Sequence, residues 1–278
     1  MSTREQRSEI AHETVEVLER GFYETNTGKK VDIESELRYA IENTELFRSV
    51  DFDDIEISGG DDGDYQVEVR NETTLKAARR VAKRDSPEPF VLNFASARNP
   101  GGGFLNGSDA QEESLARATG LYACISEVTE YYQINRQSGT GLYTDNMIYS
   151  PQVPVIRDGR GDFLEAPFTV SILTAPAVNR RVVENEEPER LSEVEPAMDD
   201  RIRKVLLVAS EKNHDILVLG AWGCGVFDNR VEIIGNLFKK HLEDEKTFKG
   251  KFENVIFAVL DVTPSRDTFN TFKRILEG

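Results

Sequence analysis

Residues 89–128 read PFVLNFASARNPGGGFLNGSDAQEESLARATGLYACISEV. The apolar run at 89–96 predicts a buried strand, and Gly101-Gly102-Gly103 predicts a turn after it. Residues 111–128 have the pattern of a helix that is interrupted near Gly120. A strand, a glycine-rich loop and a helix in this order predict an α/β fold, in which helices cover both faces of a sheet.

The chain from residue 65 onward repeats this alternation of strands and helices. Further strands are expected at 65–70, 168–176, 215–222 and 254–261. Further helices are expected at 73–84, 196–212, 229–244 and 265–278. The acidic stretch 184–195 is most simply a solvated loop.

The first 60 residues have a different pattern. Residues 4–24 predict an amphipathic helix, and a second helical pattern runs through Ile33 and Ile41. The turn cluster GGDDGD at 59–64 follows a strand-like stretch and marks the expected boundary. We therefore expect an N-terminal helical accessory region at 1–60 and a second domain at 61–278.

Composition and charge exclude several classes of protein. The 278 residues are 38% hydrophobic, which is enough for a core, and their net charge is −16. This acidity argues against direct DNA binding. Residues 1–64 and 182–200 carry the negative excess, so an anionic ligand should bind to the nearly neutral remainder.

The residues that usually bind metals or form disulfides are few. Two cysteines, Cys124 and Cys224, exclude a disulfide framework and a cysteine-rich zinc site. The three histidines are not at metal-ligand spacing, so we expect no metal. The longest apolar runs are too short to span a bilayer and no secretory signal is seen, which predicts a soluble cytoplasmic protein without membrane contact.

A second glycine-rich segment, GAWGCGVF at 220–227, lies between the expected strand at 215–220 and the expected helix at 229–244. Backbone N–H groups in such a loop, next to a helix N-terminus, can bind a phosphate. Neither loop has a Walker motif or a dinucleotide fingerprint. Each loop taken alone could equally be a tight turn, but two at strand ends of one sheet favour a ligand crevice.

The motifs then resemble a known family. Gly101-Gly102-Gly103, seven residues and Gln111-Glu112-Glu113 resemble the GGG-x(6–8)-QEE signature of poly(ADP-ribose) glycohydrolases, which are macrodomain enzymes. The segments VLNFASARNPGGGF, ESLARATGLYACI and LGAWGCGVF resemble the shorter bacterial-type branch. The resemblance covers roughly residues 65–278, and the N-terminal segment also looks like the accessory region of that branch.

The resemblance implies both a fold and an activity. The fold would be a three-layer macrodomain with a mixed central sheet, plus the N-terminal helical accessory segment. The activity would be hydrolysis of the ribose–ribose O-glycosidic bonds of poly(ADP-ribose), mainly from the chain end, with ADP-ribose as product and no cofactor. The partners would be poly(ADP-ribose) or ADP-ribosylated proteins.

The resemblance also assigns roles to residues. Glu113 would be the catalytic acid and base, and Glu112 would position the ribose beside the scissile bond. The segment Gly223 to Val226 would hold the diphosphate, Phe227 would pack on the terminal ribose, and either Asn99 or Ser96 would replace the family's ribose-binding Asn. The expected ligand contacts are Asn99, Gly101, Gly102, Gly103, Gln111, Gly223, Cys224, Gly225, Val226, Phe227 and, at adenine N6, Glu72.

The chemistry of two adjacent glutamates limits the mechanism. Glycosidases usually place two carboxylates about 5–9 Å apart across the bond, whereas neighbours on a helix point about 100° apart. Glu113 must therefore protonate the leaving 2′-oxygen alone and then take a proton from the attacking water. Burial, Glu112 and the bound diphosphate should raise its pKa in the substrate complex, against the helix dipole.

Three alternatives remain at this point. Two acids in the first turn of a helix can be a simple capping feature. The protein could bind ADP-ribose without cleaving it, although a pure binder has no need of the acid pair. It could also remove single ADP-ribosyl groups from protein or nucleic acid.

Overall fold

The protein is seen here as a computed structural model, which describes residues 3–55, 65–82, 88–244 and 248–278. Its helices are α1 (Arg4–Arg20), α2 (Glu34–Glu42), α3 (Thr74–Val81), α4 (Gln111–Ala118), α5 (Leu121–Ser126), α6 (Thr129–Gln137), α7 (Arg180–Glu186), α8 (Val194–Glu211), α9 (Val231–Lys239) and α10 (Asp267–Leu276). Its strands are β1 (Phe22–Glu24), β2 (Lys30–Asp32), β3 (Glu45–Phe47), β4 (Gln66–Arg70), β5 (Phe90–Phe94), β6 (Met147–Arg157), β7 (Phe163–Ala175), β8 (Ile216–Leu219) and β9 (Asn254–Ala258).

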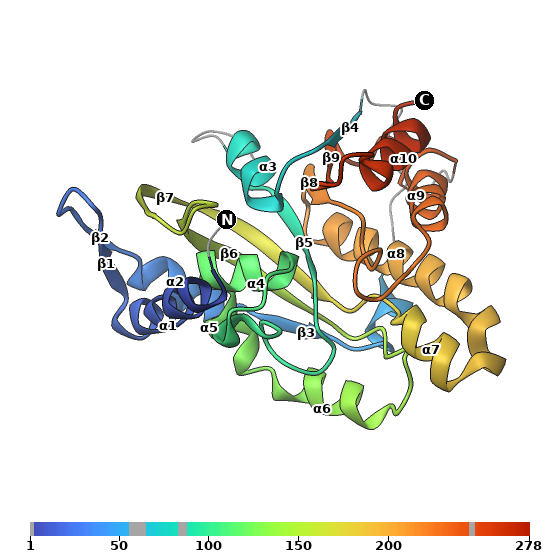
Figure 1. Cartoon of the computed structure of the whole chain (residues 1–278), viewed down its shortest axis with the longest axis horizontal. Helices are drawn as coiled ribbons and strands as arrows, with labels where there is room; N and C mark the ends of the chain where they lie inside the picture. The colour runs from blue at the N-terminus through green and yellow to red at the C-terminus, as the bar shows by residue number, and fades with distance from the viewer. Residues whose placement is uncertain (1–2, 56–64, 83–87, 245–247) are drawn as a thin grey trace.

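A seven-stranded sheet forms the centre of the molecule, in the order β3-β6-β7-β5-β8-β9-β4 (Figure 1). Five strands form a parallel set, in the order β7-β5-β8-β9-β4. Strand β6 runs antiparallel to both of its neighbours, β7 and β3. The sheet is therefore mixed. Its parallel part brings the carboxyl ends of β5 and β8 to the same edge.

Alternate side chains of the parallel strands enter two different cores. In β5, Phe90 and Leu92 pack with residues of α8, α9 and α10, whereas Val91 packs with residues of α3, α4 and α5. Strands β8 and β9 alternate in the same way. Both faces of the sheet are thus covered by helices, which gives the three-layer α/β architecture seen in Figure 1.

The N-terminal region packs on one side of this sheet. Helix α1 is followed by the antiparallel hairpin β1–β2 and by α2, and a small core joins Val17 and Leu37 to Ile156 of β6. Strand β3 then pairs with β6 and becomes an edge of the main sheet. The expected boundary at 59–64 lies outside the described residues, and the division at residue 60 stays a prediction.

The expected strands at 65–70, 89–96, 168–176, 215–222 and 254–261 are present as β4, β5, β7, β8 and β9. The interruption near Gly120 is confirmed, since α4 ends at Ala118 and α5 begins at Leu121. Thr119 in the gap forms an isolated bridge to Val155 of β6. Because Thr119 has an extended backbone at this bridge, α4 ends before it.

Two expectations about local structure are wrong. The helix expected over 4–24 ends at Arg20, because Gly21 caps it in the left-handed conformation and the chain turns into β1. The acidic stretch 184–195 is not a loop: it completes α7, forms a 3-10 helix at Pro188–Glu193 and starts α8, with most of its acids in solvent. Residues 51–54, in the strand-like stretch that precedes the turn cluster at 59–64, form a short 3-10 helix.

Candidate active site at the ends of β5 and β8

Two glycine-rich loops meet at one edge of the sheet because β5 and β8 are parallel neighbours. Phe90 pairs with Leu217, and Val91 pairs with Val218. The loop after β5 leads into α4, and the loop after β8 leads into α9. The two glycine-rich loops that the sequence predicts as phosphate-binding segments therefore lie side by side in the fold.

The first loop is folded tightly around its glycines. Gly101 and Gly102 have φ of +68° and +59°, which an L-amino acid with a side chain rarely adopts. The loop is closed by hydrogen bonds from Gly102 N to Asn99 O and from Phe104 N to Gly101 O, at 3.0 and 3.2 Å. A Cβ on Gly101 would lie 3.2 Å from Cβ of Ala116, so the loop lies directly on α4.

Glu113 is held by the backbone at both carboxylate oxygens. Its Oε1 accepts a hydrogen bond from Gly103 N, and its Oε2 accepts one from Ala110 N, both at 3.0 Å. The side chain is partly exposed, so it can reach a ligand. A carboxylate fixed between loop and helix, but open to solvent, is suited to transfer a proton at a defined point.

Glu112 points the other way, into the protein. Its Oε2 accepts a hydrogen bond from Ser96 N at 2.7 Å, and its Oε1 lies 3.4 Å from Nδ2 of Asn93. Only 4% of the residue is exposed. Burial, and to a smaller extent the neighbouring Glu113 charge, raises the pKa of Glu112 to about 8, against the hydrogen bonds that favour the carboxylate. Glu112 is therefore largely protonated near neutral pH.

Gln111 ties the start of α4 to the end of β5. Its side-chain oxygen accepts from Phe94 N at 2.8 Å, and its amide donates to Leu92 O at 2.8 Å and to Thr74 Oγ1 at 3.2 Å. The amide is occupied by these contacts, so Gln111 supports the site from behind. Its expected contact with the ligand stays a prediction.

Asn99 and Ser96 differ in how they are used. The side chain of Asn99 is exposed at the tip of the loop, where a ligand could reach it. The hydroxyl of Ser96 accepts hydrogen bonds from the N–H groups of Arg98 and Asn99, at 3.2 and 3.1 Å. Ser96 therefore shapes the turn, and which of the two residues meets the ribose stays a prediction.

Asn93 is a site residue that the sequence reasoning missed. It is fully buried in β5, where Nδ2 donates to Thr174 Oγ1 at 3.1 Å as well as facing Glu112. Its Oδ1 has no hydrogen-bond partner among the described residues. A polar residue inside the apolar run VLNFAS is the signal that could have found it, because an unpaired buried amide is costly.

The second loop presents its backbone to solvent. Hydrogen bonds from Asn229 Nδ2 to Val178 O and Gly223 O, at 2.7 and 3.2 Å, hold its base. Among the described residues, the N–H groups of Gly225, Val226 and Phe227 have no hydrogen-bond acceptor. Space for a Cβ is open at Gly225. Unsatisfied donors that precede α9 can bind an anion. The expected contact of this loop with a diphosphate stays a prediction.

Phe227 and Cys224 complete this loop. Phe227 is half-buried, and its ring centroid lies 6.1 Å from that of Tyr143, which comes from a different part of the chain. Val226 is 72% exposed. Burial raises the pKa of Cys224 to about 12, so its thiol stays protonated and is no nucleophile.

Glu72 lies apart from these residues. It follows β4, which is separated from β5 by β8 and β9. Its carboxylate is buried and accepts a hydrogen bond from Arg80 at 3.0 Å. This ion pair occupies the carboxylate, so the expected contact with adenine stays a prediction with no local support.

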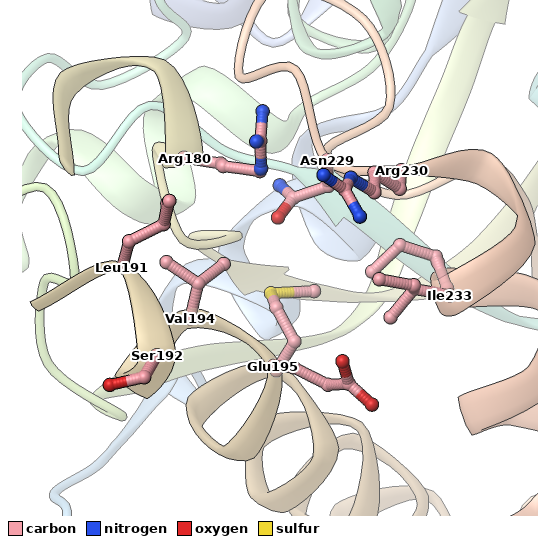
Figure 2. Close-up of a pocket in the computed structure, with 10 residues that line it drawn as sticks. Arg180, Leu191, Ser192, Val194, Glu195, Asn229, Arg230 and Ile233 are labelled. Carbon is pink, nitrogen blue, oxygen red and sulfur yellow. The ribbon is translucent and has the colours of Figure 1, made fainter. Parts of the chain in front are cut away.

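A groove of about 300 Å³ lies behind the second loop, between α7, α8 and α9 (Figure 2). Apolar side chains that include Leu191, Val194 and Met198 line it, with Arg180 and Arg230 at its edge. Asn229, which anchors the base of the second loop, also lines this groove. The groove was not expected from the sequence.

No group of three or more His, Cys, Asp or Glu side chains in the described parts of the chain could hold a metal ion. No described helix is both long enough and apolar enough to cross a bilayer.

Comparisons with known proteins agree with this geometry. Residues 11–158 match the family model of the microbial-type PARG catalytic domain. The structure is similar to poly(ADP-ribose) glycohydrolase from Thermomonospora curvata, with 41% identity, a TM-score of 0.93, and coverage of 98% of this chain and 100% of that one. It is also similar to the Deinococcus radiodurans glycohydrolase in complex with ADP-ribose, with 45% identity, a TM-score of 0.81, and coverage of 87% and 97%. No curated protein matches the chain.

Proposed function

The chain belongs to the family of microbial-type poly(ADP-ribose) glycohydrolases, and we propose that Glu113 is the acid and base of its reaction. The enzyme hydrolyses ribose–ribose O-glycosidic bonds of poly(ADP-ribose). The observation that carries the role of Glu113 is its position: it is fixed by two backbone N–H groups at the glycine loop, yet it is open to a ligand.

The ligand is proposed to lie across both loops. The free N–H groups of Gly225, Val226 and Phe227 would bind the diphosphate without a basic patch, which suits a protein with a net charge of −16. The ring of Phe227 would pack on the terminal ribose. Gly102 and Gly103 would let the backbone approach the ribose beside the scissile bond.

The two glutamates would share the chemistry unequally. Glu113 protonates the leaving 2′-oxygen as the C–O bond breaks, and its carboxylate then takes a proton from the water that attacks the ribosyl carbon. Glu112 would hold a ribose hydroxyl from the buried side. Its raised pKa means that it can donate a hydrogen bond to the ligand as well as accept one.

The expected rise of the pKa of Glu113 concerns the complex with substrate and stays a prediction. In the protein without ligand, burial raises the pKa of Glu112 to about 8. A protonated Glu112 reduces the negative charge beside Glu113. The neutral form of Glu112 would therefore ease the approach of an anionic substrate.

The experiment that tests this function compares substrates. The protein is incubated with poly(ADP-ribose) of defined length and with mono-ADP-ribosylated protein, and free ADP-ribose is measured over time. Release from the polymer alone supports the proposed reaction. Release only from the mono-modified protein would favour the alternative hydrolase, and binding without release would indicate a module that recognises ADP-ribose.

A further inference from the structure

Side chains of helix α1 form hydrogen bonds to the backbone of the loop that carries the glycine triplet. Three consecutive backbone carbonyls of that loop, at residues 105, 106 and 107, each accept a hydrogen bond from an α1 side chain. The distances are 2.6 Å from Ser8 Oγ to Leu105 O, 2.9 Å from Arg4 Nε to Asn106 O, and 2.9 Å from Arg7 Nε to Gly107 O. Positions 4, 7 and 8 share one face of a helix, so the contact is continuous.

The packing beneath these hydrogen bonds is close. Ala11 of α1, Phe104 of the loop and Ala116 of α4 form a small buried core. Gly107 has φ of +71°, and a Cβ there would overlap the carbonyl group of Arg4. The backbones of α1 and the loop touch at this glycine, which leaves no room for another residue.

Helix α1 also contacts the helix that carries the glutamates. Thr14 Oγ1 donates to Arg117 O at 2.7 Å near the end of α4, and Arg157 of β6 donates to Thr14 Oγ1 at 3.0 Å. Asp109, just before α4, pairs with both Arg7 and Arg117, at 3.6 and 2.6 Å. One helix therefore contacts both sides of the turn between the loop and α4.

Two sets of hydrogen bonds connect this contact to the carboxylate of Glu113. Ser108 N and Asn106 N donate hydrogen bonds to Gly103 O, at 3.2 and 3.0 Å, so the segment that α1 contacts holds Gly103 by its carbonyl group. Gly103 N then donates to Glu113 Oε1. The face of α1 that meets the loop carries Arg4 and Arg7, whereas the acids Glu5, Glu9 and Glu16 face solvent.

We infer that α1 is part of the catalytic apparatus, with Arg7 and Ser8 as positioning residues that set the direction of the Glu113 carboxylate. This inference rests on the proposed role of Glu113. Neither residue meets the substrate: each acts through the loop carbonyl that it binds. A displacement of about 1 Å in a reacting group can lower a rate about a hundredfold, so a loosened loop should be visible in kcat.

The test is the double variant R7A/S8A, with R38A/S35A on α2 as its control. The control removes the same two side chain types from the exposed face of α2, where among the described residues they bond only to neighbouring glutamates of that helix. For R7A/S8A we expect kcat on poly(ADP-ribose) to fall at least about tenfold, while the Kd for ADP-ribose changes less than about twofold, since the second loop is untouched. The variant R7K/S8T keeps both donors and should recover most of the activity.

Hydrogen exchange gives a readout that does not depend on activity. Amides of residues 99–110 should exchange faster in R7A/S8A than in the wild type, and at the wild-type rate in R38A/S35A. If kcat and loop exchange both stay unchanged, α1 does not position the loop. If kcat, ligand affinity and thermal stability fall together and R7K/S8T rescues none of them, α1 is only a stabilising element. If the wild type releases no ADP-ribose from polymer, the proposed function fails, while the exchange data still decide whether α1 holds the loop.

Discussion

The carboxylate of Glu113 lies where the side chain of residue 102 would be if that residue were not glycine. A Cβ on Gly102 would overlap Oε1 of Glu113, and it would lie 3.1 Å from Oε2 of Glu112. The two adjacent glutamates therefore approach one point from different directions, although they diverge along the helix. The absence of a side chain at Gly102 leaves room for both carboxyl groups, of which that of Glu113 is partly exposed and that of Glu112 is buried.

Glu113→Gln should abolish turnover, because the amide cannot supply or take up the proton. The affinity for ADP-ribose should stay within about tenfold, because the shape of the side chain is kept. The measurement is the rate of ADP-ribose release together with titration calorimetry. Turnover near the wild-type rate would remove Glu113 from the mechanism.

The same substitution should have a modest effect on stability. The carboxylate accepts from Gly103 N and Ala110 N, and a glutamine offers only one oxygen to these two donors. We expect a loss of about 1 kcal/mol, or about 2–4 °C in Tm. A larger loss would indicate that the loss of turnover reflects unfolding.

Gly102→Ala and Gly225→Ala form a matched pair that separates the two loops. Gly102 has φ of +59° and no space for a Cβ, so alanine should cost about 1–2 kcal/mol of stability and displace Glu113. Gly225 has open space, so alanine there should leave Tm unchanged. A larger side chain, Gly225→Val, should still weaken ADP-ribose binding, because it would block approach of the diphosphate.

Titration calorimetry measures the Kd for ADP-ribose, and thermal melts measure the Tm, for the Gly102 and Gly225 variants. Gly102→Ala should lower kcat and Tm together. Gly225→Val should raise the Kd for ADP-ribose without a change in Tm. If Gly102→Ala keeps the wild-type kcat and Gly225→Val binds ADP-ribose as the wild type does, the two loops are ordinary turns and the ligand lies elsewhere.

The buried carboxyl group of Glu112 should make the free energy of unfolding depend on pH. Its pKa rises from 4.5 to about 8 on folding, so the folded form binds an extra proton between these values. The stabilisation linked to this proton is complete below pH 4.5 and is lost as the pH rises through about 8. Glu112→Gln carries no such proton, so the stability of this variant relative to the wild type should increase from pH 5 to pH 9.

Urea unfolding at pH 5, 7 and 9 measures this difference. Glu16→Gln, which removes an exposed carboxyl group from α1, controls for the change in net charge. A difference between the wild type and Glu112→Gln that does not vary over this range would mean that Glu112 is ionised in the folded protein throughout.

Local patterns predicted the strands and helices that surround the site. The seven residues between Gly103 and Gln111 are close enough in sequence to bring Glu113 back to the triplet, and the strand–loop–helix pattern places both glycine loops at strand ends. Strand β6 was missed because Pro151, Pro154 and a register shift between Ser150 and Val153 disturb its alternation. Its pairing with β7 and β3 is a property of the whole fold.

Other parts of the site had no signal in the sequence. Helix α1 binds the loop through backbone carbonyls, which every residue has, so no motif marks the contact. The pairing of Glu72 with Arg80, away from the two glycine loops, joins residues eight positions apart, which is beyond the i+3 and i+4 pairs that a helix brings into contact. Burial decides the pKa of Glu112, and it depends on how Ser96 and Asn93 are placed by the sheet.

The ring of Phe227 bears on the direction in which the polymer is attacked. Phe227 follows the proposed diphosphate loop, and its ring lies beside that of Tyr143. In the proposed binding mode this aromatic pair borders the adenosine end of the ligand. An internal unit of the polymer continues through the 2′-oxygen of its adenosine ribose, and a ring packed on that ribose leaves no exit for the chain. We therefore expect mainly exo-cleavage, with ADP-ribose released from the start of the reaction.

Phe227→Ala should open this end of the site and weaken ADP-ribose binding by about 1–3 kcal/mol, because a stacking surface is lost. Phe22→Ala, which truncates a half-buried ring in the N-terminal hairpin, is the control and should bind ADP-ribose as the wild type does. An early time course of labelled polymer on a sequencing gel shows the direction of attack. In the wild type, oligomers of intermediate length that appear before ADP-ribose would contradict a closed end, whereas in Phe227→Ala their appearance would show that the ring is what closes it.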